Sequence, residues 1–173
     1  MAVAPDTILR LAEARDVEAV SNLVRTRSAA LSYGTDEEFE VWFQRNYGLE
    51  AMTSKFEQPM MTCLVVIESN ALIGYAHINL QTTELGGLHV AKDSQGAGTL
   101  LTEALIEIAR TSGLERVILT VAEHNSRVIR QVLRHGFSYY SCVTENPPSF
   151  ESTTFHRYEK FLSPSPVDEP TPL

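Results

Sequence analysis

The amino-acid sequence predicts a single globular domain of the mixed α/β (α+β) class. Its 173 residues suit one hydrophobic core. Apolar residues make up 43% and charged residues 21%, a composition that excludes a disordered chain. Strand-like and helix-like hydropathy patterns alternate along the sequence. We expect the domain to cover residues 1–162. Residues 163–173 hold four prolines and almost nothing apolar, which predicts a flexible tail.

The first third of the chain predicts a strand followed by two helices. Residues 8–12 favour a short strand, and Asp16 is expected to cap a helix whose apolar residues recur at helical spacing. Thr35 then begins an acidic segment in which aromatic residues recur at i, i+3 and i+4, as on one face of a second helix. These aromatics are Phe39, Trp42 and Phe43. The stripe favours a face packed on the core, with the lining of an acceptor site as the alternative.

Two apolar, β-branched runs follow, over residues 62–68 and 72–80, joined at Ser69-Asn70-Ala71. Two such runs separated by turn residues predict a hairpin. Gly74 interrupts the second run, but the alternation resumes after it. Gly74 therefore predicts a bulge or a close backbone approach rather than the end of the strand.

The middle of the chain predicts a βαβ unit. A strand over residues 84–90 leads through a turn at 93–98 into a helix that begins near Thr99 and runs to about Ser112. Gly113 ends this helix, as glycine commonly does. A strand over residues 116–121 completes the unit.

The C-terminal part predicts one more helix and two strands. Asn125-Ser126 is expected to cap a helix that Gly136 ends, with an apolar stripe formed by Val128, Ile129, Val132 and Leu133. Strands are expected over residues 137–143 and 153–161. The predicted order is therefore β, α, α, β, β, β, α, β, α, β, β.

Charge and composition narrow the classes of partner. The net charge is −8 and no basic run is present. Nucleic acid is therefore not expected as a partner, because phosphate binding needs a concentrated Lys/Arg surface. An acidic surface favours a cationic acceptor such as an amine. Residues 1–7 lack the features of a signal peptide and no stretch approaches a membrane span, so we expect no membrane partner and a cytoplasmic location.

The cysteines and two of the histidines predict core residues rather than metal ligands. Cys63 and Cys142 lie in apolar runs without metal-ligand spacing, which favours buried thiols in a reducing compartment. His77 and His89 lie on apolar strands with no further ligand at metal spacing. We therefore expect no metal site.

The Gly96-Ala97-Gly98 turn predicts an anion site. It follows a strand and opens a helix, where unpaired N–H groups and the helix dipole attract a phosphate and glycine allows a close approach. A dinucleotide fingerprint would need a third glycine at position 101, where the chain has Leu101. The turn alone is thus a general phosphate cradle.

An ordered set of residues makes this turn more specific. The set is Leu88-His89-Val90, Gln95-Gly96-Ala97-Gly98, Leu101 and Leu105, residues 117–121, Asn125-Ser126-Arg127 and Gly136-Phe137. In spacing and residue type it resembles the Gcn5-related N-acetyltransferase (GNAT) superfamily. The resemblance implies a mostly antiparallel sheet of six to seven strands, flanked by about four helices. It also implies a splay between the central strands, where acetyl-CoA lies as the cosubstrate.

The resemblance also implies cofactor-binding residues. Backbone groups of Leu88, His89 and Val90 would meet the acyl carbonyl and the pantetheine arm, and Asn125 would anchor the pantetheine or the helix entry. The pyrophosphate would lie on Gln95, Gly96, Ala97, Gly98 and Thr99.

The family's turn pattern fits this sequence in two registers. Anchored on the helix, both glycine positions are filled and Asp93 takes the usual Gln/Arg place. Anchored on the strand, Gln95 fits but Leu100 replaces the last glycine. We favour the helix register, because the other would put Glu103 on the buried face.

The resemblance suggests Glu84 as the catalytic base, since some family members carry a glutamate at this strand position. Alternation puts Glu84 on the same face as Leu88 and Val90. An exposed glutamate at a strand end is the alternative. The tyrosine that many members use to protonate the thiolate corresponds here to Val132. Tyr139, Tyr140, His124 and His135 are conceivable substitutes, but no acid is assigned.

The function favoured by the sequence is N-acetyl transfer from acetyl-CoA to a primary amine of a small molecule, peptide or protein. The alternative is a non-catalytic, acyl-CoA-binding regulatory domain of the same fold, to which Val132 and the altered turn point. A purely structural α/β domain is the third hypothesis. A homodimer is allowed but not specified by the sequence.

Overall fold

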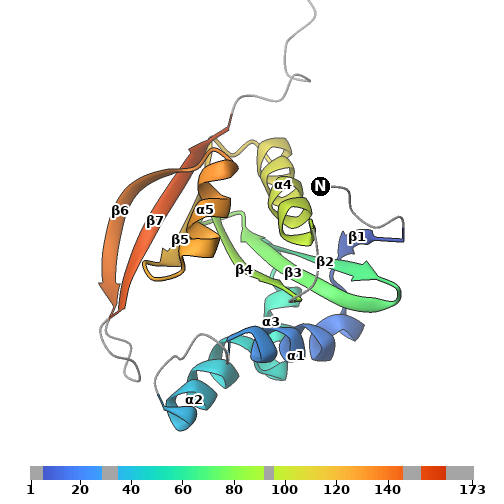
Figure 1. The fold of residues 1–173 in the computed structure, drawn as a ribbon. Coiled ribbons are helices and arrows are strands. Elements are labelled where there is room, and N and C mark those ends of the chain that lie inside the picture. The colour runs from blue at the N-terminus through green and yellow to red at the C-terminus, as the bar shows by residue number, and fades with distance from the viewer. Residues whose placement is uncertain (1–5, 29–34, 92–95, 146–152, 163–173) are drawn as a thin grey trace, which may run out of the picture.

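The computed structural model describes residues 6–28, 35–91, 96–145 and 153–162. One sheet of seven strands, in the order β1-β2-β3-β4-β5-β7-β6, forms its centre (Figure 1). The strands are β1 (Ile8–Leu11), β2 (Met61–Glu68), β3 (Ala71–Asn79), β4 (Glu84–Val90), β5 (Arg116–Ala122), β6 (Ser138–Glu145) and β7 (Thr153–Phe161). The helices in the described residues are α1 (Val17–Ser28), α2 (Asp36–Tyr47), α3 (Leu49–Glu57), α4 (Ala97–Thr111) and α5 (Ser126–Arg134), with a 3-10 turn over Ala14–Asp16.

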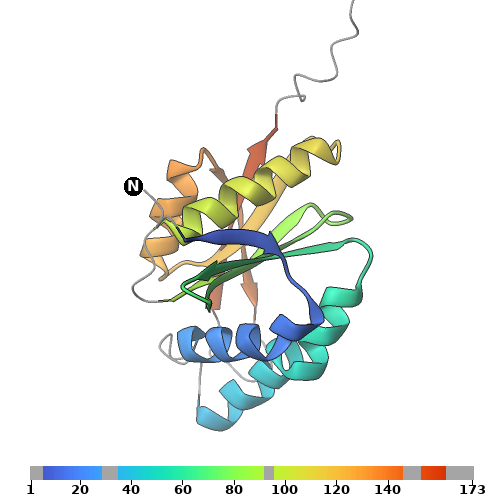
Figure 2. The ribbon, with the colours of Figure 1, turned by 90° about the vertical axis from the view of Figure 1, so that its right-hand side faces the viewer.

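The sheet is mostly antiparallel and is covered on both faces. Of its neighbouring strands, only β4 and β5 run parallel, as expected where a helix connects them. Helices α4 and α5 cover one face and α1–α3 cover the other (Figure 2). Each face has its own apolar core, one centred on Leu101 and Leu105 of α4 and the other on Val20 and Val24 of α1. The fold class expected from the sequence is confirmed. No helix in the described ranges is long and apolar enough to cross a membrane.

The predicted hairpin is formed by β2 and β3, with Ser69 and Asn70 as its two turn residues. Both have positive φ angles, 49° and 64°, as a tight I′-like hairpin turn requires. Gly74 combines the two roles considered for it. The register shifts opposite it, between Val66 and Ile67, and a Cβ on Gly74 would lie 3.0 Å from Leu101 Cδ1 of α4. The glycine thus allows the helix to pack closely on the sheet.

The N-terminal helices agree only in part with the sequence pattern. Thr35, at which the second helix was expected to begin, caps α2. It accepts a hydrogen bond from the Glu38 amide, while the Glu38 side chain accepts from the Thr35 amide. Asp16 was predicted as the cap of the first helix. Its carboxylate instead accepts hydrogen bonds from the Glu13 amide and from the Arg10 guanidinium, with donor–acceptor distances of 2.6 to 2.8 Å. Helix α3 was not predicted at all.

One prediction for the C-terminal strands was wrong. Cys142 is exposed rather than a core thiol, and Tyr139 on the same strand is 52% exposed. Both lie on β6, which is the edge strand of the sheet and contributes no residue to either apolar core. Cys63 on the central part of β2 is buried, as expected.

Candidate functional site

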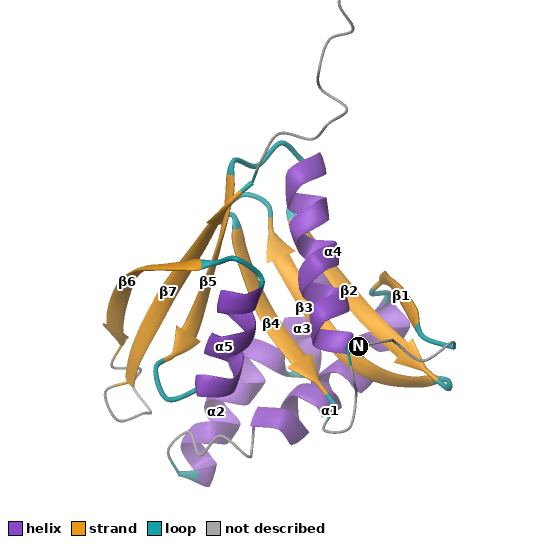
Figure 3. Ribbon diagram, turned by 45° about the horizontal axis from the view of Figure 1, so that its top comes forward, coloured by secondary structure: helices purple, strands orange, loops and turns teal. Residues whose placement is uncertain are grey.

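The two parallel strands at the centre of the sheet separate soon after they begin. β4 and β5 pair at only two positions, Glu84 with Ile118 and Leu85 with Leu119. Figure 3 shows them diverging beyond this point, with α5 beside the gap. Backbone groups along a strand point alternately to its two sides. The side of β4 that faces β5 therefore offers backbone donors and acceptors that are not paired to that strand from Gly86 onward. The predicted splay is confirmed.

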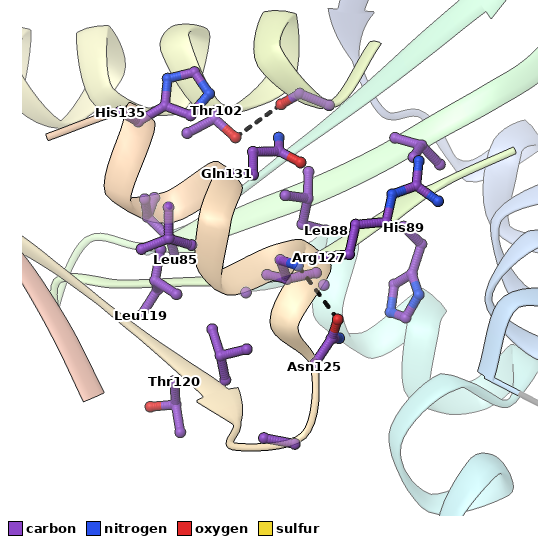
Figure 4. Close-up of a pocket in the computed structure, with 18 of the residues that line it drawn as sticks. Leu85, Leu88, His89, Thr102, Leu119, Thr120, Asn125, Arg127, Gln131 and His135 are labelled. Atoms are coloured by element: carbon purple, nitrogen blue, oxygen red, sulfur yellow. Dashed lines mark hydrogen bonds between the residues drawn. The ribbon is translucent and has the colours of Figure 1, made fainter. Parts of the chain in front are cut away.

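A cavity of about 470 Å³ occupies this gap (Figure 4). Residues 85–90 of β4 and 119–122 of β5 line it from the sheet, and Phe155 of β7 lies at its edge. From α4 and α5 come Gly98, Thr102, Leu105, Asn125, Arg127, Val128, Gln131, Val132 and His135. Arg27 reaches the cavity from α1, on the opposite face of the sheet. The cavity thus passes through the sheet and connects its two faces.

The N-terminus of α4 opens onto this cavity without a side-chain cap. Gly96 precedes the helix with φ 82°, a left-handed conformation that favours glycine, and no side chain in the described residues hydrogen-bonds to the first-turn amides. The first turn also holds no acidic residue. Amides of Ala97, Gly98 and Thr99 are therefore available to an anion. Gln95 and Asp93 lie outside the described residues. Glu103 is exposed, as the helix register requires.

Gly98 also brings α4 and α5 together at the cavity wall. A Cβ at this position would lie 2.9 Å from Gln131 Nε2, so the end of the Gln131 side chain would have to shift to make room for it. Asn125 begins α5, and its Oδ1 accepts a hydrogen bond from the Val128 amide over 3.3 Å. The predicted cap is confirmed. Asn125 also lines the cavity together with Leu88, His89 and Val90.

A bulge in β4 changes which side chains share a face. Leu85 opposes Ile78 and Gly86 opposes His77, but His89 opposes Tyr75, so β4 has one more residue than β3 in this stretch. Gly87 adopts φ 61° there. Side chains before Gly87 and side chains after it therefore do not follow one continuous in-and-out alternation: residues an even number of positions apart across Gly87 lie on opposite faces of the sheet.

The expectation that Glu84 shares a face with Leu88 and Val90 was therefore wrong. Leu88 and Val90 pack into the core with α4, whereas Glu84 lies on the side of His89, towards α1–α3. Glu84 is exposed and does not line the cavity itself. Its Oε1 accepts a hydrogen bond from Thr120 Oγ1, 3.2 Å away, and Thr120 does line the cavity.

The residues considered for thiolate protonation are spread widely. Val132, at the usual tyrosine position, is buried and lines the cavity. Of Tyr139, Tyr140, His124 and His135, only His135 lines it. Burial lowers the pKa of His135, and its carbonyl accepts from Lys160 Nζ.

His77 and His89 are neutral and partly buried, as expected for core histidines. Burial, and then the positive charge of Lys55, lower the pKa of His77 to about 3 and that of His89 to about 4. Tyr75 Oη lies 3.1 Å from His77 Nδ1, and the His89 ring meets Tyr47 edge-on with centroids 5.5 Å apart. The described residues hold no group of three or more potential metal ligands.

Several residues of the cavity were not singled out in the sequence. Arg27, Thr102 and Gln131 stand on helices whose patterns indicate only which face is apolar. Arg127 appears in the family-like segment, but its residue type alone does not indicate a role. Gln131 offers the clearest signal in retrospect, since it is a polar residue beside the apolar stripe of α5.

A sheet that splays between two parallel strands, beside an uncapped helix N-terminus, is the architecture that the resemblance to the GNAT superfamily implies. The family model described as acetyltransferase (GNAT) family matches residues 27–137. The chain therefore belongs to the GNAT acetyltransferase family. Acetyl-CoA is the cosubstrate of this family, as the sequence predicted. No curated protein matched the sequence.

Solved structures show the same fold at low sequence identity. PaiA N-acetyltransferase from Thermoplasma acidophilum, in complex with coenzyme A, superposes with a TM-score of 0.74 at 18% identity, over 90% of this chain and 99% of that one. A probable acetyltransferase from Staphylococcus epidermidis has a TM-score of 0.75 at 11% identity, over 91% and 99%. A spermidine N-acetyltransferase (SpeG) variant from Vibrio cholerae has a TM-score of 0.66 at 19% identity, over 91% and 95%.

Proposed function

We propose that this protein is an N-acetyltransferase that transfers an acetyl group from acetyl-CoA to a primary amine. One observation carries the proposal: the uncapped N-terminus of α4 and the open side of β4 face the same cavity. The first suits a pyrophosphate and the second suits an extended arm with amide groups. Coenzyme A combines these two chemistries in one molecule.

The parts of the coenzyme can be assigned in order along the cavity. The pyrophosphate would lie on the amides of Gly96, Ala97, Gly98 and Thr99, with Gln95 as the further predicted partner. The pantetheine arm would add to the open side of β4 at Leu88, His89 and Val90, beside Asn125. The thioester would then lie in the gap between β4 and β5.

The reaction requires a neutral amine next to the thioester carbonyl. The amine nitrogen bonds to the acyl carbon, backbone N–H groups of β4 stabilise the oxyanion, and the carbon–sulfur bond then breaks. The amine loses a proton and the thiolate gains one. Glu84 is the proposed base. Its carboxylate lies on the side of the sheet away from α4 and α5 and outside the cavity, but it bonds to Thr120, which lines the cavity. Glu84 would therefore act through a water near Thr120. His135 and solvent are the candidates for the thiolate proton, because Val132 has no proton to give.

The experiment has two measurements. Calorimetric titration with CoA tests binding, and thiol release from acetyl-CoA with a broad panel of amines tests turnover. We expect saturable binding and amine-dependent release. Binding without release would refute the enzyme and support the regulatory acyl-CoA-binding domain, whereas no binding would leave a structural domain. A single domain over residues 1–162 and a cytoplasmic location remain predictions.

A further inference from the structure

The charge of the cavity is opposite to the charge of the protein. The chain carries a net charge of −8, yet no Asp or Glu is among the described residues that line the cavity. Its ionisable side chains are Arg27, Arg127, His89 and His135. The acidic first turn of α2, Asp36 to Glu38, is outside the lining, with Asp36 and Glu37 exposed and Glu38 half-buried. The overall charge is thus a poor guide to the acceptor.

The two arginines reach the cavity from opposite faces of the sheet. Arg127 belongs to α5, on the face that also carries the N-terminus of α4 and hence the proposed phosphate site. Arg27 belongs to the last turn of α1, on the other face. If CoA occupies the side of α4 and α5, the amine must approach the thioester from the side of α1 and His89. Arg27 is therefore placed for the acceptor and Arg127 for the coenzyme.

Arg27 has no carboxylate partner among the described residues, unlike two other arginines of the N-terminal segment. Arg25 pairs with Glu40 over 2.7 Å and Arg10 pairs with Asp16 over 2.6 Å. Lys55, also on this face, lies over the Tyr47 ring at 4.7 Å and likewise has no ion pair there. On the α1 side of the cavity, His89 is neutral, so the fixed positive charge there comes from Arg27, in a largely apolar setting. A planar guanidinium in such a setting matches a carboxylate in geometry and charge.

We propose that the acceptor is an amine that also carries a carboxylate, and that Arg27 binds this carboxylate. The inference rests on the proposed acetyl transfer. Arg27 would hold the amine in line with the thioester without taking part in proton transfer. Carboxylate recognition would thus distinguish an amino acid from the matching amide, which has nearly the same shape but no negative charge.

The test compares the proteinogenic α-amino acids with their carboxamides as acceptors, using acetyl-CoA and thiol release. We expect kcat/KM to favour the acid over its amide by at least about 10-fold in the native protein. Arg27→Gln should raise KM for the acid by about 10- to 100-fold, the loss expected for a charge-assisted hydrogen-bonded pair, and bring acid and amide close together. KM for acetyl-CoA should not change. Arg25→Gln, on the same helix but outside the cavity, should keep the native preference.

Equal kcat/KM for acid and amide in the native protein would overturn the inference. A raised KM for acetyl-CoA in Arg27→Gln, with KM for the acid unchanged, would overturn it as well. An unchanged CoA titration shows that the variant is folded. If no amine is turned over, the proposed function fails by itself. Calorimetric titration of the same acids and amides into the protein–CoA complex then decides the inference: Arg27-dependent binding of the acids supports it, and equal or absent binding overturns it.

Discussion

Glu84 is the residue on which the proposed chemistry depends most. Its carboxylate is exposed, bonded to Thr120, and separated by the bulge from the face of Leu88 and Val90. Replacement by glutamine keeps the shape and removes the base. We expect Glu84→Gln to lower kcat by about 10²- to 10⁴-fold at neutral pH, the range of general-base catalysis, with CoA binding unchanged.

Measurement of kcat against pH gives this prediction its control. Loss of a base should be partly recovered at high pH, where the amine is already neutral. Glu123→Gln, an exposed carboxylate after β5 that is outside the cavity, should behave as the native protein. A native rate in Glu84→Gln would show that solvent alone accepts the proton.

Gly87 is the residue that permits the bulge of β4. It has φ 61°, and a Cβ there would lie 2.6 Å from His77 Nδ1 and 2.8 Å from Tyr75 Cε1, two partly or fully buried rings. Gly87→Ala should therefore cost about 2–4 kcal/mol in unfolding free energy, as backbone strain and overpacking combine. Gly113→Ala is the matched control. It has a similar φ, 75°, but nothing within 4 Å of the added carbon, so about 1–2 kcal/mol is expected. Equal losses in denaturant unfolding would contradict the clash.

At the scale of elements, the cap of α5 is expected to contribute both to the stability of the fold and to the binding of CoA. Asn125 accepts from the Val128 amide and lines the cavity, so Asn125→Ala should cost about 1 kcal/mol in unfolding free energy and also weaken CoA binding. Thr35→Ala removes the cap of α2, which is outside the cavity. We expect a similar loss of stability there with CoA binding unchanged. Chemical denaturation and calorimetry of both variants check the prediction, which fails if they bind CoA equally.

The sequence predicted most elements because each carries its own local signal. Asn125 was recognised as a cap and Thr35 as the start of a helical segment from residue type and spacing, and the hairpin was recognised from its turn. Helix α3 had no such signal, because Gly48 precedes it without a side-chain cap and Met52 is its one fully buried residue. Cys142 was misplaced because an apolar run does not indicate whether its strand is central or at an edge.

At the scale of the whole molecule, the neutral histidines couple stability to pH. An unfolded chain protonates histidine near pH 6.5, whereas His77 and His89 in the folded chain do so only near pH 3 and 4. Between these values the unfolded chain binds more protons, so the unfolding free energy falls as the pH falls below about 6.5. The limiting slope is about 1.4 kcal/mol per pH unit for each histidine.

Denaturant unfolding between pH 4.5 and 7.5 measures this dependence. His77→Gln should flatten the slope, although it also lowers stability overall. His124→Gln, at an exposed position, should leave the slope as it is. An unchanged slope in His77→Gln would mean that His77 does not contribute to the acid sensitivity.

Local signals in the sequence were enough to identify most of the elements, the glycine turn, the Asn125 cap and the family, because these depend on neighbours along the chain, but not helix α3. Only the tertiary structure decided the face of Glu84, since a single extra residue at Gly87 reverses alternation without changing the hydropathy pattern. The same holds for Arg27. It lies about sixty residues before β4 in sequence, and only packing of α1 across the sheet brings it to the cavity.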